Sequence, residues 1–247
     1  RLFRNTVFTG AITANLISMM VDVGFIYFAS QHLQLVSGLP PMYAGMLLIP
    51  GTLATIIAGL VIARVAVHFH PAQVVSFGLA LNAAAFAVLA FLGAHHDVVI
   101  ILIFIVLGTG IGIAQTISND LMLSSVPPRK AGAASAISET SYEMGAVLGT
   151  VIIGGMLTAI YRANVVMPAG LDETLADHAH ETLGGAVSVA SHVGGEQASQ
   201  LLSSAFAAFD SGVVLSSAFS AVLMGVMAVI SYLMIRKAPR EMKPAEH

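Results

Sequence analysis

The chain has 247 residues, of which 57% are hydrophobic and only 9% are charged. Because about a quarter of the residues in a soluble domain are charged, this composition excludes an ordinary soluble protein and indicates a membrane protein. Cysteine is absent, which excludes disulfides and thiolate metal sites. The net charge is −3, and the basic residues lack the density of a nucleic-acid-binding patch.

Six apolar segments are each long enough to cross a bilayer as a helix, which takes about 20 residues. We therefore predict an all-α membrane protein, a bundle of six transmembrane helices. In chain order the predicted spans cover approximately residues 6–30, 42–67, 72–93, 98–124, 131–161 and 209–235. The first residue is Arg1, without a methionine or a signal-peptide pattern, so we expect a part of a longer protein.

The basic residues predict the orientation of the bundle. With strict alternation of six spans, nine of the ten Lys and Arg residues fall on one side, and only Arg162 falls on the other. The positive-inside rule then places both chain ends in the cytoplasm, with residues 237–247 as a cytoplasmic tail. We expect the bacterial cytoplasmic membrane as the location, with the lipid bilayer as a partner and no nucleic acid.

The connection at residues 162–208 is long and carries most of the acidic residues outside the spans. Apolar residues recur at helical spacing over residues 171–187, and again at Leu201, Leu202 and Ala205 after the second glycine pair. These patterns predict two short amphipathic helices folded as an extracellular hairpin before the last span. A solvated loop without fixed structure is the alternative.

The fifth span contains the sequence SETSYEMGAVLG at residues 138–149, which carries two carboxylates in an apolar helix. Glu139 and Glu143 share one face, and Gly145 and Gly149 share the opposite face. We expect the glycine face to pack closely on a neighbouring helix and the glutamates to face a cavity near the middle of the bilayer. Two carboxylates in a poorly solvated place cannot both ionise cheaply, so the pair is suited to carry a proton or bind a cation.

The first span carries Asp22 about 24 Å from its cytoplasmic end, in the outer half of the bilayer. Asn15 and Ser18 share the face of Asp22, and we predict that Met19 and Phe25 line the same cavity. The alternative for Asn15 and Ser18 is a structural stripe that bonds a neighbouring helix. A carboxylate at this depth is costly, which favours a functional role for Asp22.

Further polar residues are weaker candidates. Gln115 in the fourth span is a candidate for lining a polar path, whereas Asp120, beside Asn119, suits an ordinary interfacial role. Tyr142 either lies at the edge of the cavity or packs against the next helix. The histidines at positions 95, 96, 178 and 180 lack the spacing of a metal site, so we predict no metal. No catalytic constellation or phosphate-binding loop is visible, and we predict neither an enzyme nor a cofactor.

Three motifs together resemble a known family. They are GLPPMYAGMLLIP at residues 38–50, VPPRKAGAASA at residues 126–136 and SETSYEMGAVLG. They look like the second half of the fourteen-helix drug:proton antiporters of the major facilitator superfamily, of the QacA, SmvA and LfrA type. The resemblance covers nearly the whole chain, and the hairpin before the last span also matches this subgroup. The loop IARVAVHFHPAQ at residues 62–73 is at best a degenerate copy of the superfamily's loop motif.

The resemblance implies a function. It implies a proton-coupled antiporter that exports lipophilic cations in multidrug and antiseptic efflux, in which Asp22, Glu139 and Glu143 serve proton coupling and cation recognition. Its partners would be organic cations, protons and the N-terminal transmembrane half of the same protein. A proton-coupled exporter of an endogenous solute is one alternative. A membrane scaffold or receptor that transports nothing and works through the hairpin is another.

Overall fold

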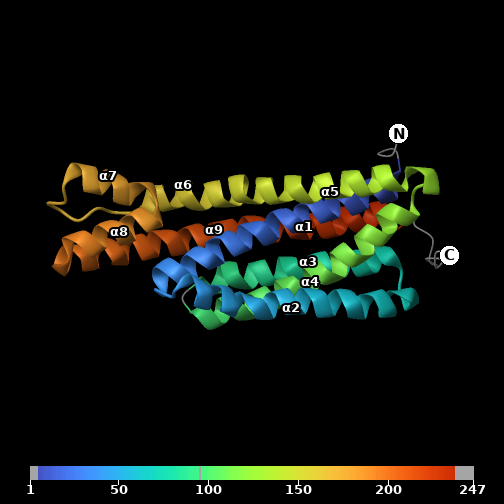
Figure 1. Ribbon diagram of the computed structural model, residues 1–247, viewed down its shortest axis with the longest axis horizontal. Helices are drawn as coiled ribbons and strands as arrows, with labels where there is room; N and C mark the ends of the chain where they lie inside the picture. Colours follow the sequence, from blue (N-terminus) through green and yellow to red (C-terminus); the bar gives the residue numbers. More distant parts are fainter. Residues whose placement is uncertain (1–4, 95, 237–247) are drawn as a thin grey trace.

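In the computed structural model, which describes residues 5–94 and 96–236, the chain folds into a bundle of long helices (Figure 1). Six helical stretches are long and apolar enough to cross a membrane, which confirms the six predicted spans. No strand occurs in the described residues. The main elements are α1 (Thr6–Gln31), η2 (His32–Val36), α2 (Pro41–Val65), α3 (Pro71–Leu92), α4 (Asp97–Ser124), α5 (Ala131–Leu148), η5 (Gly149–Gly154), α6 (Gly155–Asn164), α7 (Glu173–Glu181), α8 (Leu183–Val193) and α9 (Gly195–Ile235).

Local sequence signals set the ends of these helices. The side chain of Asn5 accepts hydrogen bonds from the N–H groups of Val7 and Phe8 and so caps α1. Proline occupies the first position of α2 and of α3, where no N–H partner is needed. Gly93 ends α3 with a φ of 68°, a conformation that residues with a Cβ avoid. The predicted tail at residues 237–247, Arg1, Arg4 and His95 lie outside the described residues.

The helices pack as an antiparallel bundle in which α1, α3 and α5 run in one direction. α3 lies along α4 and α9, α5 lies along α1, and α2 packs along α4 (Figure 1). An aromatic cluster fills the space where α1, α3 and α4 meet: the ring of Phe25 stacks on Phe104 at 5.2 Å and meets Phe28 and Phe86 edge-on. Rings in such pairs attract one another beyond the area that they bury.

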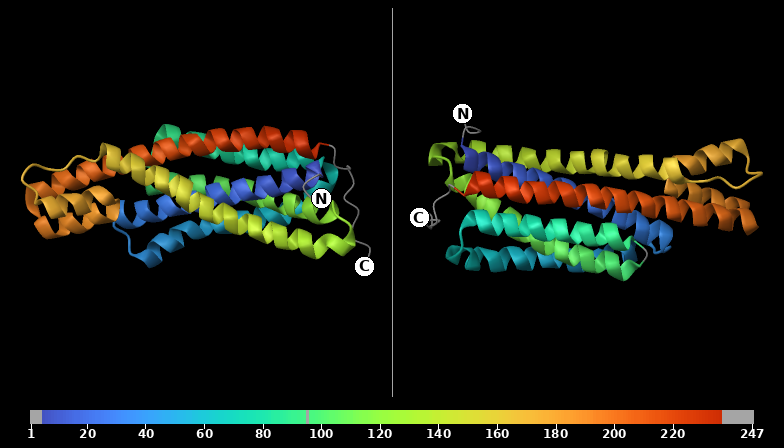
Figure 2. Two further views of the ribbon diagram at one scale, coloured as in Figure 1. Left: turned by 90° about the horizontal axis from the view of Figure 1, so that it is seen from above. Right: turned by 180° about the vertical axis from the view of Figure 1, so that it is seen from behind.

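One end of the bundle carries the start of α1 and the end of α9, and is called the terminal end here. At the other end, the hairpin end, α7, α8 and the first part of α9 extend past the remaining helices (Figure 2). The hydroxyl of Tyr161 donates a hydrogen bond to the carbonyl of Ala179 at 2.8 Å, and Arg162 Nε donates to the carbonyl of Glu181 at 3.0 Å. These bonds hold α7 against the end of α6.

The two short helices differ from the prediction in their positions. The stretch that the sequence assigned to one helix, residues 171–187, is divided at Thr182, which is extended and caps α8 through a bond from the N–H of Gly185. The expected second helix is the beginning of α9, which runs unbroken from Gly195 to Ile235. The helix that contains the last predicted span therefore begins before Phe209, because no Gly or Pro breaks the chain between Gly195 and that residue.

Candidate functional site

The glycine face of α5 and η5 packs directly on α1, as the sequence predicted. A Cβ atom added to Gly145 would lie 2.5 Å from the backbone oxygen of Leu16, and one added to Gly149 would lie 2.3 Å from that of Met20. Both distances are far shorter than a van der Waals contact, so only glycine permits this approach. The helix is thereby fixed with its opposite face turned away from α1.

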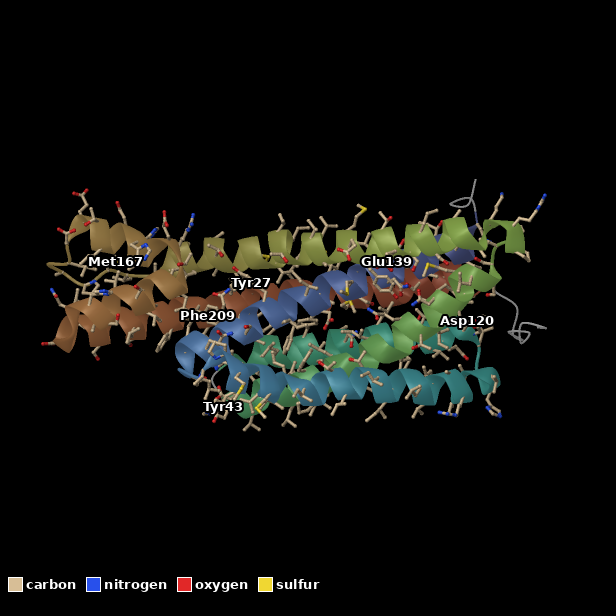
Figure 3. All side chains as sticks on the ribbon, viewed as in Figure 1. Tyr27, Tyr43, Asp120, Glu139, Met167 and Phe209 are labelled. Carbon is tan, nitrogen blue, oxygen red and sulfur yellow. The ribbon has the colours of Figure 1, made fainter. Side chains whose placement is uncertain are left out.

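That opposite face carries Glu139 and Glu143. Both side chains are exposed in this chain. Neither carboxylate has a hydrogen-bond or ion-pair partner among the described residues. An apolar helix thus presents two unpaired carboxylates on a face that the chain itself leaves uncovered. Figure 3 shows Glu139 on α5 and Asp120 on α4, both in the part of the bundle toward the terminal end.

A cluster of polar side chains joins α1, α4 and α5 beside Glu139. Asn15 Nδ2 donates to Asn119 Oδ1 and to the hydroxyl oxygen of Tyr142, both at 3.2 Å. Asn119 Nδ2 donates to the same hydroxyl at 2.7 Å, and the hydroxyl of Ser138 donates to Asn119 Oδ1 at 3.2 Å. We call these four residues the amide–tyrosine cluster. The amide of Asn15 thus links three helices, α1, α4 and α5.

The amide–tyrosine cluster borders a small hollow between α4 and α5. The hollow measures about 190 Å³, and its polar lining consists of Asn119, Ser135, Ser138, Glu139 and Tyr142. Tyr142 therefore lies at the edge of this hollow. Glu143 is not among the residues that line this hollow. The volume suits a few water molecules or the end of a ligand, rather than a whole drug-sized molecule.

The structure places Asp22 at a different level from the glutamates. Gly149 packs between Met20 and Gly24 of the parallel helix α1, so Asp22 is level with Gly149. At 1.5 Å per residue, Asp22 then lies about 9 Å beyond Glu143 and about 15 Å beyond Glu139 along the helix axis, toward the hairpin end. Asp22 is half-buried and does not line the hollow that contains Glu139.

Asp22 nevertheless lies on the same face of α1 as Asn15, a member of the amide–tyrosine cluster. Asn15 contacts both α4 and α5, so the face of α1 that carries Asn15 looks into the seam between these helices. Asp22 is seven residues further on, two helical turns along the same face. Gln115 lies one turn from Asn119 on the same face of α4 and is half-buried. Polar groups therefore follow this seam from the amide–tyrosine cluster toward the hairpin end.

Three of the weaker candidates have different surroundings. Phe25 is completely buried in the aromatic cluster, where its ring stacks on Phe104. Ser18 is also completely buried, and its hydroxyl has no partner among the described residues. Met19 is half-buried, and its Cβ lies next to Gly145. The sequence offered no sign of Asn119 and Ser138 as members of the site, apart from their polarity. In the described parts of the chain, no three His, Asp or Glu side chains gather as a metal site requires.

The hydroxyl of Tyr142 supplies a test of the amide–tyrosine cluster. Tyr142→Phe removes the oxygen that accepts from both Asn15 and Asn119, and we expect the free energy of unfolding to fall by about 1 kcal/mol, the scale of polar contacts between membrane helices. Unfolding of the full-length protein in bicelles with added detergent measures this change. Tyr232→Phe is the control, because Tyr232 is exposed on α9 and its hydroxyl has no partner among the described residues. Equal stability of the two variants would contradict the role of the cluster.

Comparison with known proteins agrees with a membrane transport fold. A family model of the major facilitator superfamily matches residues 1–150. The structure resembles that of a bacterial homologue of the human lysosomal transporter Spinster in an inward-facing, occupied conformation, with a TM-score of 0.69 and 18% identity. That match covers 98% of this chain and 51% of the homologue, and at this identity it shows the fold alone.

Two curated relatives are more similar in sequence. The chain is 44% identical over 237 residues to the multidrug efflux pump LfrA of Mycolicibacterium smegmatis, covering 96% of this chain and 47% of LfrA. It is 31% identical over 247 residues to the methyl viologen resistance protein SmvA of Salmonella typhimurium, covering 97% and 49%. The chain thus spans about half the length of these relatives.

The fold and the family match together define the class of protein: the chain belongs to the major facilitator superfamily. With six apolar helices and bacterial relatives, it is a multi-pass protein of the bacterial cytoplasmic membrane.

Proposed function

We propose that the full-length protein is a proton-coupled antiporter that exports lipophilic organic cations, and that this chain is its C-terminal half. The observation that carries the proposal is the pair Glu139 and Glu143, two unpaired carboxylates on an apolar helix, turned away from the face that packs on α1. Such a pair binds either protons or a cation, and that competition is what an exchange of the two requires.

The names of the relatives support the choice of substrate. LfrA is described as a multidrug efflux pump and SmvA as a methyl viologen resistance protein, and methyl viologen is an organic dication. A dication can be balanced by a binding surface that offers more than one carboxylate. Met19 and Tyr142 would add adaptable apolar and aromatic contacts that tolerate different ligands.

The proposed mechanism uses the two halves of the transporter fold. In this fold a site near the midplane lies between two bundles, and rocking of one bundle against the other alternates access. Asp22, Glu139 and Glu143 form the wall that this chain contributes. Open to the outside and protonated, the wall releases its cation; open to the cytoplasm and deprotonated, it binds another. By the positive-inside rule the terminal end faces the cytoplasm and the hairpin end faces outward.

The uncovered surface of this chain fits the missing half as a partner. In the apolar window of the second span, which contains α2, only 6% of the residues are buried, because α2 packs mainly along α4. Large apolar side chains such as Met46, Leu53 and Ile57 are about half exposed on it. Together with the outer face of α5, this surface would pack on the N-terminal half and on lipid.

The proposal is tested with full-length protein in liposomes under an imposed proton gradient. Ethidium, tetraphenylphosphonium and methyl viologen serve as substrates, and proton movement is followed with an enclosed pH indicator. We expect each cation to drive proton movement in the opposite direction. Failure of all three cations to move protons would refute the proposal and favour a solute exporter of another kind or a protein that transports nothing.

The level of Asp22 gives a second test. Asp22 lies nearer the hairpin end than the glutamates, where it suits the second charge of a dication. We expect Asp22→Asn to lower methyl viologen transport about tenfold and ethidium transport much less, because losing one charge contact costs roughly 1.4 kcal/mol. The ratio of the two initial rates in the same liposomes measures this selectivity. An equal loss for both cations would assign Asp22 to proton coupling instead.

A further inference from the structure

A second and larger hollow lies at the hairpin end of the bundle. It measures about 660 Å³ and is formed where η2, the turn between α3 and α4, and α9 meet. None of its lining residues belongs to the hollow beside Glu139. Figure 3 shows Phe209, one of its lining residues, on α9 close to the end of α1. We call it the hairpin-end hollow.

The charged groups of the hairpin-end hollow are held in place by short contacts. Asp97 Oδ1 lies 3.2 Å from His32 Nε2 and accepts a hydrogen bond from the hydroxyl of Ser37 at 2.5 Å. Asp210 Oδ1 accepts a hydrogen bond from the backbone N–H of Ala94 at 2.7 Å. The lining described by the structure therefore contains two carboxylates against one imidazole, with no Lys or Arg. The balance of charge is negative even when His32 is protonated.

Two aromatic side chains form part of the remaining lining of the hollow. Phe206 and Phe209 both line the hollow, the first half-buried and the second almost completely buried. A cation over the face of an aromatic ring is attracted to it, and more strongly where water is excluded. The volume falls in the range of sites for drug-sized ligands, about 300–1,000 Å³. Fixed carboxylates beside aromatic rings suit an organic cation with an apolar body better than a small hydrated ion.

The place of the hollow relates it to the wall that carries Asp22. His32 follows Asp22 by ten residues in one continuous helical stretch, about 15 Å further toward the hairpin end. We propose that the hairpin-end hollow is a second binding site for lipophilic organic cations, which an exported cation occupies after it leaves Asp22 and the glutamates. The identity of the ligand rests on the proposed function, whereas the site is defined by this chain's own residues.

Equilibrium binding of ethidium to purified full-length protein, followed by its fluorescence, tests the site. We expect two ethidium molecules per chain in the parent and one in Glu139→Gln/Glu143→Gln. Asp97→Asn/Asp210→Asn should also bind one, and the variant with all four changes should bind none. Asparagine keeps an oxygen that accepts from Ser37 and Ala94, so the local contacts of the carboxylates are preserved. The molecule still bound at the glutamates shows that the aspartate variant is folded.

Two further measurements establish the chemistry of the ligand. Phe206→Ala should weaken binding at the second site about tenfold through loss of the ring. Tetraphenylphosphonium should displace ethidium from that site and Mg²⁺ should not. Glu173→Gln, which removes an exposed charge from α7, should bind ethidium as the parent does.

The outcomes separate this inference from the proposed function. Two molecules bound by Asp97→Asn/Asp210→Asn, or displacement by Mg²⁺ alone, would overturn the second site and leave the proposed function intact. Binding of only one ethidium molecule by the parent would also overturn the second site and leave the proposed function intact. A parent that neither binds nor exports any organic cation would overturn both.

Discussion

Replacement of both Glu139 and Glu143 by glutamine in the full-length protein should lower proton-driven ethidium efflux by about a hundredfold, as two lost charge contacts of about tenfold each would predict. The remaining rate should depend much less on pH, since only Asp22 of the three carboxylates is left to take up a proton. Glutamine has nearly the shape of glutamate but takes up no proton and carries no charge to balance a cation. Because both side chains are exposed and unpartnered in this chain, the change breaks no contact that the bundle needs to fold.

Efflux from liposomes, measured at several external pH values, provides the readout, and Glu173→Gln on α7 controls for loss of a negative charge elsewhere. Of the single variants, Glu139→Gln should have the larger effect, because Glu139 borders the hollow lined by Tyr142 and Asn119, whereas Glu143 does not. A double variant with unchanged efflux and pH dependence would remove the glutamates from the mechanism. The function would then have to rest on Asp22 or on residues of the other half.

The sequence predicted the architecture because lipid makes strict demands on a helix. A spanning segment must be long and apolar, so the six spans could be located from composition alone, and their number and order agree with the structure. The two faces of the fifth span followed from helical geometry. Gly145 and Gly149 pack on α1 and the glutamates face away from it, as their spacing predicted. The length, hydropathy and two faces of a helix can each be determined from the sequence of that helix alone.

What the sequence could not supply is the register between helices. In the sequence, Asn119 was notable only as the residue next to the interfacial Asp120. In the structure, the crossing of α1, α4 and α5 places Asn119 Nδ2 2.7 Å from the hydroxyl oxygen of Tyr142. Phe25 shares a helix face with Asp22, but the neighbouring α4 presents Phe104 at its level and encloses it. No spacing within a single helix contains that information.

The beginning of α9 shows a related limit. Hydropathy marks the apolar part of a helix, whereas the helix itself continues until a residue breaks it. Gly194, with a φ of 63°, provides that break, and the polar residues between it and Phe209 continue the helical turn. The long connection is consequently a short pair of helices followed by a rigid extension of α9, which also brings Phe206 and Asp210 to the hairpin-end hollow.

The packing of α5 on α1 predicts whether Gly149→Ala raises or lowers the free energy of unfolding. Alanine normally stabilises a helix by up to about 1 kcal/mol relative to glycine. At Gly149 the added methyl would lie 2.3 Å from the backbone oxygen of Met20, which cannot move aside as a side chain can. We therefore expect Gly149→Ala to lower the free energy of unfolding by about 2 kcal/mol, the typical cost of overpacking.

Gly155→Ala is the matched control for this prediction. Gly155 begins α6, six residues beyond Gly149, and a Cβ there would meet no atom within 4 Å. Helix propensity alone should then operate, so this variant should be as stable as the parent or up to about 1 kcal/mol more stable. Detergent-induced unfolding of the full-length protein in bicelles measures both. If Gly149→Ala also proved stabilising, α5 would not lie against α1 at this distance, and the outward direction of the glutamates would lose its structural basis.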